Sequence, residues 1–461
     1  MDELKNPNTI RIGVCGIAGV GKTTLAKAVH KQATEDKELF DDVVILLDVK
    51  SNTDLEGIQK KIVEKLGMDI LDNDTIDGRA SRLSARIKDK KVLVILDDVC
   101  EQIDLVAVGL PSVAACKILL TSRFRKTLSD MSTQKEFLLD ILQEKESWVL
   151  FEKKALDVVK DPAILEVAKQ VAKNCGGLPI LVVTVASVLK QRTTLPPWTD
   201  ALTCLQEGSD REEELAEKAH LGLEWSYKQL NDKELKQIFL LCGITIRGNS
   251  ISLADLLRYS MGLGFLKKAF TVEEARKALL SRIEKLKDYC LLIESDDNRY
   301  VRMHELVLNV ANQIAFRDRH ILSLVEDGGN RELKELSDKY FLEKCTIMSF
   351  PCGNNIPRLP EVMHCPTLTM FHLQGDLDDD SQKISPRFFE KMKNLQVLSL
   401  RCMTIPTLPL SLQFLKNLVF LCLDQCILGD VALIGELSNL EILSFSESNV
   451  KQLPTAGDWK S

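Results

Sequence analysis

The sequence predicts a multidomain α/β protein, in which a parallel sheet with its helices is followed by helical regions and then by a repeat array. Three observations lead to this fold class. Short apolar runs alternate with helical patterns over residues 10–135, helical spacing without strands follows from about residue 140, and the last third repeats one leucine template. The 461 residues are enough for two to four domains, because single cores stop growing at about 250–300 residues.

The first region reads as a parallel sheet, because its apolar runs are short and each is followed by a helical pattern. Helices are predicted to begin near Lys22, Asp54 and Arg79. The predicted strands are Ile10–Cys15, Val43–Val49, Val92–Leu96 and Lys117–Thr121.

A glycine-rich segment joins the first predicted strand to the first predicted helix. It matches the pattern G-x-x-x-x-G-K-[ST], in which converging backbone N–H groups at a helix N-terminus bind phosphate. Lys22 is predicted to reach the β- and γ-phosphates, and the Thr23 hydroxyl to hold Mg²⁺. The sequence therefore predicts that a nucleotide binds here. The predicted contacts are Gly16, Ile17, Ala18, Gly19, Val20, Gly21, Lys22, Thr23 and Thr24.

Two later strands end in charged residues that fit the same site. The apolar run from Lys91 ends in Asp97 and Asp98, where we expect Asp97 to hold Mg²⁺ through its water shell and Asp98 to orient a water molecule. The run from Cys116 ends in Arg123, whose guanidinium can reach a γ-phosphate. A surface arginine after a strand is the alternative for Arg123.

The middle of the chain is predicted to be helical. Gly176 and Gly177 end one helix, and Leu178-Pro179 begins the next. After further helices, residues 290–294 and 300–303 read as a β-hairpin, which suits a winged-helix domain. Such domains often bind DNA, but a net charge of −7 gives no support for nucleic acid as a partner. An interaction role or a structural role is therefore favoured for this domain.

The C-terminal third repeats the template L-x-x-L-x-L. The four copies recur within the leucine-rich-repeat spacing of about 20–29 residues, and an asparagine precedes the strand in the last three. We expect stacked strands whose x positions carry partner contacts. The copies begin at Leu368, Leu395, Leu418 and Leu440, and the asparagines are Asn394, Asn417 and Asn439.

Composition places the chain among intracellular globular proteins. The 13 cysteines form no C-x-x-C pair, which favours reduced thiols over a disulfide framework. Cys422 and Cys426 with His372 would allow a metal site, but core packing explains them more simply. No signal peptide follows Met1, and the longest apolar run is too short to span a bilayer. We expect a cytoplasmic protein with no membrane span, and a fragment of a longer one.

Five segments together resemble the NB-ARC nucleotide-binding switch of plant intracellular immune receptors with leucine-rich repeats. The segments are similar to that family's P-loop, kinase-2 strand, sensor-arginine strand, G-L-P-L motif and M-H-D motif. In chain order they are residues 16–24, 91–98, 117–123, 175–179 and 301–305. The order of these motifs, followed by leucine-rich repeats, is highly specific and covers nearly the whole chain.

The resemblance implies a domain order and a mechanism. It implies a P-loop NTPase domain over residues 1–135, a small helical domain over 136–209, a winged helix over 210–330 and truncated leucine-rich repeats over 335–461. It also implies an ADP-bound off state and an ATP-bound on state with at most slow hydrolysis. Pro179 would pack on the nucleotide, and His304 would contact the ADP β-phosphate. The implied partners are a pathogen effector or a guarded host protein, and the receptor itself when active.

Three departures from the family pattern leave details open. Glu305 stands where the family has aspartate, and Cys100 stands where the two receptor classes carry tryptophan or aspartate. Residues 239–242 favour the coiled-coil class. We expect the family's N-terminal signalling domain to lie outside this fragment, ahead of the P-loop. Two rival functions remain: a turnover ATPase of the motor or remodelling type, and a repeat scaffold with a vestigial site. The intact Lys22, Thr23 and Asp97 argue against the scaffold.

Overall fold

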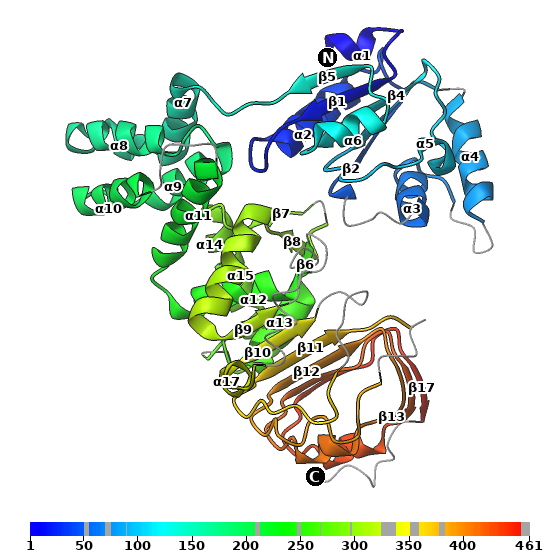
Figure 1. Cartoon of the computed structure of the whole chain (residues 1–461), viewed down its shortest axis with the longest axis vertical. Helices are drawn as coiled ribbons and strands as arrows, with labels where there is room; N and C mark the ends of the chain where they lie inside the picture. Colours follow the sequence, from blue (N-terminus) through cyan, green and yellow to red (C-terminus); the bar gives the residue numbers. More distant parts are fainter. Residues whose placement is uncertain are drawn as a thin grey trace. The chain divides into compact units, whose positions relative to one another are not determined.

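The computed structural model describes two compact units, Met1–Gly222 and Leu223–Ser461 (Figure 1). The described residues are 1–49, 55–69, 75–88, 90–207, 213–246, 250–267, 269–295, 297–323, 338–350, 359–377 and 383–452. Within these ranges no helix has both the length and the apolar character that crossing a membrane requires. Asp54, near which one helix was expected to begin, lies outside them.

The first unit is built on a five-stranded sheet in which all neighbours are parallel, in the order β2-β3-β4-β1-β5. Four strands form where the sequence predicted them, and the edge strand β5 is additional. The strands are β1 (Arg11–Cys15), β2 (Asp42–Leu46), β3 (Val92–Leu96), β4 (Cys116–Ser122) and β5 (Lys135–Leu138). β5 escaped prediction because only two of its four residues, Phe137 and Leu138, are apolar.

Helices cover both faces of this sheet. Alternate residues of the interior strand β3 belong to different cores: Val94 packs with α3, α4 and α6, whereas Leu93 packs with α1 and α2. Both faces of β3 are therefore buried, which explains its continuous apolar sequence. The helices are α1 (Asp2–Lys5), α2 (Lys22–Glu35), α3 (Leu55–Lys65), α4 (Ile76–Lys88), α5 (Leu105–Val108) and α6 (Arg125–Asp130).

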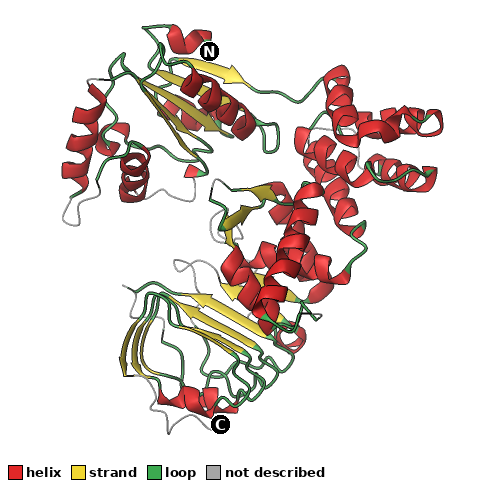
Figure 2. Cartoon of the chain, turned by 180° about the vertical axis from the view of Figure 1, so that it is seen from behind, coloured by secondary structure: helices red, strands yellow, loops and turns green. Residues whose placement is uncertain are grey.

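A strandless helical part completes the first unit (Figure 2). Its central helix α9 is almost entirely buried, which fits its uninterrupted apolar sequence. Trp198 is fully buried and donates its indole N–H to the Arg192 carbonyl at 2.8 Å. The elements are α7 (Glu144–Ala155), η2 (Leu156–Lys160), α8 (Pro162–Asn174), α9 (Pro179–Leu189) and α10 (Leu195–Gln206), and α11 (Glu213–Lys228) crosses the boundary between the units.

The second unit begins with residues 223–319, called here the helix–hairpin region. The predicted hairpin is present, since β7 pairs antiparallel with β8, and β6 adds a third strand on the other side of β8. The elements are α12 (Lys233–Thr245), β6 (Ser250–Ser252), α13 (Leu253–Gly262), α14 (Val272–Asp288), β7 (Ile293–Glu294), β8 (Tyr300–Arg302) and α15 (Glu305–Arg319).

Residues 321–452, called here the repeat region, form a parallel sheet in the order β16-β14-β12-β11-β10-β9. Each leucine template supplies one strand. Its apolar template residues are buried in the first three copies and half-buried in the last. The strands are β9 (Ile321–Ser323), β10 (Ile347–Phe350), β11 (Met370–Gln374), β12 (Val397–Arg401), β14 (Phe420–Cys422) and β16 (Ile442–Ser444). α17 (Lys339–Lys344) precedes β10, and η4 (Leu410–Phe414) and η5 (Ala432–Glu436) join later strands.

The asparagines before the strands hold consecutive repeats together. The side-chain amides of Asn394, Asn417 and Asn439 donate to main-chain carbonyls one repeat earlier, at 2.8, 3.0 and 2.7 Å. A second sheet, β13 (Thr404–Thr407), β15 (Ile427–Asp430) and β17 (Asn449–Gln452), runs alongside these repeats. The twelve described cysteines are all free, and the described residues hold no cluster of His, Cys, Asp and Glu suited to a metal ion.

Candidate functional site

The predicted phosphate loop connects β1 to the N-terminus of α2. Gly19 and Gly21 adopt φ values of 78° and 107°, a left-handed conformation that glycine adopts without steric cost. A Cβ on Gly16 would lie 2.5 Å from the Leu139 carbonyl oxygen. These three glycines are therefore required by the backbone path, which brings the loop to a helix N-terminus with unpaired N–H groups.

Lys22 is buried at the start of α2, with its side chain turned into the loop. Its Nζ donates to the carbonyl oxygens of Gly16 and Ile17 at 2.7 and 3.0 Å. Burial lowers the pKa of this ammonium group, and the nearby carboxylate of Asp98 opposes that shift. The loop thus holds a positive charge where phosphate oxygens would bind.

Thr23 and Asp97 come together as the sequence predicted. The Thr23 hydroxyl donates to Asp97 Oδ2 at 2.7 Å, and a second hydroxyl, that of Thr121, donates to Asp97 Oδ1 at 2.6 Å. Burial raises the pKa of Asp97, while the bonds from Thr121 and Thr23 act in the opposite direction. A hydroxyl and a carboxylate this close form the oxygen donor set that Mg²⁺ prefers beside a nucleotide, so these residues fit the predicted ion.

Asp98 and Arg123 lie next to this pair. Arg123 Nε is 3.5 Å from Asp98 Oδ1, so the two residues form an ion pair at the ends of β3 and β4. Asp98 has φ = 59°, an uncommon value for a residue with a side chain. Its N–H donates to the Thr121 hydroxyl at 2.9 Å. Arg123 and both carboxylates therefore lie at one edge of the sheet.

The segment before Pro179 contacts the phosphate loop. Pro179 is the first residue of α9, and the N–H of the next residue, Ile180, donates to the Gly19 carbonyl at 3.4 Å. Gly177 has φ = 70°, and a Cβ there would be 2.2 Å from the Leu142 carbonyl oxygen. The helical part thus places half-buried Pro179 beside the loop, and its packing on a nucleotide stays a prediction.

The remaining predicted residues differ in exposure and location. Ile17 and Thr24 are exposed, Ala18 is half-buried and Val20 is buried. His304 belongs to the second unit, where it is the N-cap of α15 and its Nδ1 accepts from the Leu306 N–H at 3.2 Å. Its contact with a nucleotide stays a prediction.

Thr121 is the residue of this site that sequence reasoning missed. It is the last residue of the predicted strand Lys117–Thr121, and the functional role was given to Arg123, two residues further on. The available signal was that parallel strands end at the same edge of a sheet, which brings a hydroxyl on β4 next to a carboxylate on β3.

In the second unit, the expectation that the x positions face a partner is wrong for the first repeats. Met370, Val397 and Phe420 are at most 1% exposed and pack with the core of the helix–hairpin region. Gly262 at the end of α13 fits closely against them, since a Cβ there would be 2.7 Å from Val397. Apolar side chains at these positions are therefore used for packing within the chain.

Polar x positions contact the same helix. The Tyr259 hydroxyl lies 3.1 Å from Ser399 Oγ, which is 3.0 Å from His372 Nδ1. These contacts account for His372 by hydrogen bonding rather than by a metal. On β10, the Ser349 hydroxyl donates to the Ile244 carbonyl at 2.7 Å.

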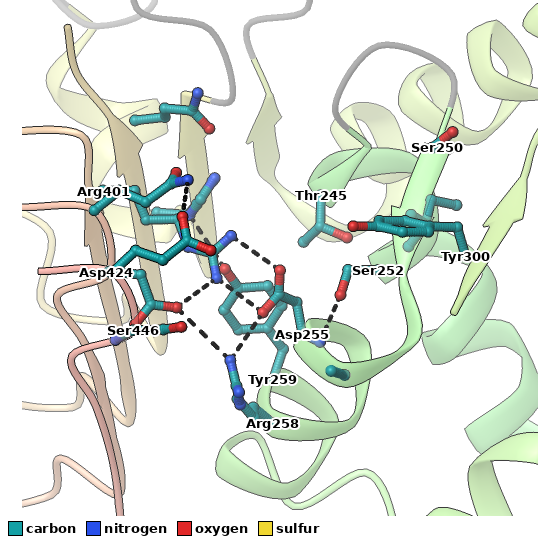
Figure 3. A pocket seen from close by; sticks show the side chains of 16 residues that line it. Thr245, Ser250, Ser252, Asp255, Arg258, Tyr259, Tyr300, Arg401, Asp424 and Ser446 are labelled. Atoms are coloured by element: carbon teal, nitrogen blue, oxygen red, sulfur yellow. Dashed lines mark hydrogen bonds and ion pairs between the residues drawn. The ribbon is translucent and has the colours of Figure 1, made fainter. Parts of the chain in front are cut away.

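Charged residues line the edge of this contact (Figure 3). Arg401 donates to both carboxylate oxygens of Asp255 at 2.9 and 2.8 Å, and to Asp424 at 2.9 Å. Arg258 lies 3.1 Å from Asp255. The group borders a cavity of about 360 Å³ lined by both regions, including Tyr300 and Glu447.

The first unit defines a P-loop nucleotide-binding protein: a parallel α/β fold in which a glycine loop, a lysine, a threonine and a buried carboxylate meet at one sheet edge. The NB-ARC domain model matches residues 1–160. Disease resistance protein At4g27190 of Arabidopsis thaliana is 31% identical over 98% of this chain and 46% of its own length. Disease resistance protein UNI of the same species is 27% identical over 95% of this chain and 52% of its own length. The chain belongs to this family of NB-ARC plant disease-resistance proteins.

The chain spans about half the length of these relatives. Among solved structures, a signal transduction ATPase with numerous domains from Pyrococcus horikoshii is similar to 68% of this chain and 41% of its own, with 15% identity and a TM-score of 0.37.

Proposed function

We propose that this chain is the switch module of a plant disease-resistance receptor, with an ADP-bound off state and an ATP-bound on state. The observation that carries the proposal is the 2.7 Å bond between Thr23 and Asp97 beside the buried Lys22. These groups supply a cation for the β- and γ-phosphates and an oxygen pair for Mg²⁺. Bound Mg²⁺ would neutralise phosphate charge.

In this proposal Arg123 distinguishes the two nucleotides. Its guanidinium pairs with Asp98 at 3.5 Å, and a γ-phosphate offers it a second anionic partner that ADP lacks. A ligand can shift a conformational equilibrium only through such differential contacts. Asp98 is also the residue that would orient a water molecule during slow hydrolysis.

The other parts follow the family's order. We propose a small helical domain over residues 136–209, a winged helix over 210–330 and leucine-rich repeats over 335–461, which serve sensing and autoinhibition in a cytoplasmic receptor. Partner contacts with a pathogen effector or guarded host protein would then use repeat surfaces that α13 does not cover. The active receptor would associate with copies of itself.

His304 is proposed to link the winged helix to the ADP β-phosphate. Because its Nδ1 accepts a hydrogen bond from Leu306 N–H, the proton of a neutral imidazole resides on Nε2. Nε2–H is then the donor for a phosphate oxygen. This link exists only with the off-state nucleotide geometry and therefore favours the closed state.

The paired carboxylates Asp97 and Asp98 also suit the second candidate, a turnover ATPase. Steady-state hydrolysis and nucleotide content of the purified chain separate the two. We expect almost no turnover and retained ADP. Many turnovers per minute would favour the ATPase, and failure to bind either nucleotide would contradict both functions.

A further inference from the structure

We propose that Thr121 is a positioning residue for the Mg²⁺-dependent part of nucleotide binding, because one hydroxyl fixes both Asp97 and the turn that carries Asp98. The inference rests on the proposed nucleotide function. It assigns a role to a residue near the end of β4, the strand that lies between β3 and β1 in the sheet. That location joins the carboxylate strand to the strand of the phosphate loop.

The direction of each hydrogen bond follows from the donors present. The Asp98 N–H can only donate, so the Thr121 oxygen accepts that bond at 2.9 Å. Its own proton is then directed at Asp97 Oδ1, 2.6 Å away. Thr121 is 1% exposed, so water does not replace it in either role.

The main chain of Thr121 strengthens the same connection. Its carbonyl accepts from the Val99 N–H at 2.8 Å, so Thr121 bonds to three consecutive residues after β3. The turn contains Asp98 at φ = 59°, a conformation that persists only where surrounding contacts enforce it. The neighbouring hydroxyl of Ser122 donates instead to the Val99 carbonyl at 2.6 Å.

This arrangement orients Asp97 for the ion. With Oδ1 held by Thr121, the carboxylate presents Oδ2 to Thr23. Residues that orient a metal-binding carboxylate typically change metal affinity about 10- to 100-fold when mutated. Lys22 Nζ bonds to the loop carbonyls, whereas the Thr121 hydroxyl bonds to Asp97 and Asp98. Binding without Mg²⁺ is therefore expected to be independent of this hydroxyl.

The test compares Thr121→Val, which keeps the shape but loses the hydroxyl, with Thr121→Ser, which keeps it. ADP affinity is measured by calorimetry with Mg²⁺ and with EDTA, and Mn²⁺ affinity of the ADP complex by electron paramagnetic resonance. We expect Thr121→Val to reduce the Mg²⁺-dependent gain in ADP affinity about 10- to 100-fold, and the Mn²⁺ affinity of the ADP complex by a similar factor. Its ADP affinity in EDTA should be unchanged. Thr121→Ser should restore most of both.

A matched control is Thr127→Val, since the Thr127 hydroxyl is also buried and donates to the Cys100 carbonyl at 3.0 Å. It should leave the Mg²⁺-dependent gain unchanged. If Thr121→Val does not fold, Thr121→Cys takes its place, with a smaller loss expected. The inference would be overturned if either variant kept the same Mg²⁺-dependent gain in ADP affinity as the parent. It would also be overturned if ADP affinity fell equally with Mg²⁺ and with EDTA. Absence of ADP binding by the parent would instead contradict the proposed function.

Discussion

The ammonium group of Lys22 lies inside the phosphate loop, where it donates to the carbonyl oxygens of Gly16 and Ile17. Lys22→Ala removes a charge placed for the β- and γ-phosphates, and Lys22→Arg moves it. We expect ADP affinity to fall at least tenfold for both, about 1.4 kcal/mol. Calorimetry measures this, with exposed Lys31 on the same helix changed to Ala as the control. Unchanged affinity in the Lys22 variants would contradict the nucleotide-switch proposal.

At the residue scale, the sequence predicted most of the phosphate site because its chemistry is local. Gly19, Gly21 and Lys22 lie within one turn and helix start, so their spacing alone defines their geometry. Asp97 was found because an apolar strand ended in it. Thr121 acts across two strands that are distant in sequence, and its partner became apparent only from the register of β3 with β4.

The start of α9 depends on a glycine with two constraints. Gly177 has φ = 70°, and a Cβ would meet the Leu142 carbonyl oxygen at 2.2 Å. Gly67 has φ = 64° with open space around it. Gly67→Ala should lower the free energy of unfolding by about 1 kcal/mol, because alanine is strained at a positive φ. Gly177→Ala should lower it by at least about 2 kcal/mol more, because the added methyl group also overlaps Leu142.

Chemical denaturation of both glycine variants measures this difference, and ADP titration reports on the phosphate loop. Because Ile180 next to Pro179 donates to Gly19, displacement of α9 should also weaken ADP binding in Gly177→Ala alone. Equal stability losses in the two variants would show that Leu142 yields to the added methyl group.

The contact between α13 and the repeat region contains a mostly buried ion pair. Arg401→Met leaves the carboxylates of Asp255 and Asp424 without their main partner, which should destabilise the protein by about 3 kcal/mol. The solvent-accessible Arg387–Glu390 pair supplies the control, and Arg387→Met should destabilise the protein far less than Arg401→Met. Urea unfolding measures both. Similar small losses would mean that solvent compensates Asp255 and Asp424.

Between α11 and α15, Glu224 gives the stability a pH dependence. A hydrogen bond from Arg317 lowers the pKa of Glu224 to about 2. A lowered carboxyl pKa stabilises the fold above the ordinary value near 4.5 and loses that contribution as pH falls toward 2. We expect ionised Glu224 to contribute about 1–2 kcal/mol to the free energy of unfolding, because Arg317 is 55% exposed and solvent screens the pair.

Glu224→Gln removes this contribution. The difference in unfolding free energy between the parent and Glu224→Gln should be largest above pH 5 and should shrink steadily between pH 4.5 and pH 3. A difference that is constant across this range would assign the loss to packing or neutral hydrogen bonds. Arg317 also pairs with Asp318, so Asp318→Asn tests whether that neighbour contributes.

At the element scale, prediction succeeded where apolar periodicity was sustained. The templates gave β11, β12, β14 and β16, because each repeat needs its leucines buried by the next. β9 and β10 were missed since they lack the template but extend the same sheet. The prediction that the x positions contact a partner was also wrong for the first repeats. Strand periodicity identifies which face a side chain occupies, but it does not identify the helix that packs on that face.

Over the whole chain, the order of motifs predicted the order of the domains. It did not predict the contacts that form where one region packs against another. The repeat face beside α13 is an example: Val397 and Phe420 would read as partner contacts in an isolated array, yet they share a core with the helix–hairpin region. How His304 acts also depends on its place in the fold. As N-cap of α15 it has a structural role that the motif alone does not reveal.

The last prediction separates these two roles of His304. His304→Ala removes the cap acceptor and the proposed Nε2–H donor, whereas His304→Asn keeps a good cap acceptor and loses the imidazole. A charge-assisted contact to phosphate contributes about 1.5–3 kcal/mol, so both variants should release ADP roughly 10- to 150-fold faster. Only His304→Ala should also lose about 1 kcal/mol of stability from its unsatisfied helix start.

The dissociation rate of a fluorescent ADP analogue measures the first effect, and denaturation the second. Glu305→Asp keeps the negative charge that favours a helix N-terminus, so it should be nearly neutral, whereas Glu305→Val should change ADP release in the same direction as His304→Ala. In the full-length receptor, faster release should give signalling without a pathogen ligand, because an open state populated at about 1% rises to roughly 10–60% when the closed state is destabilised by this much. If His304→Asn retains ADP as long as the parent, then His304 serves α15 alone.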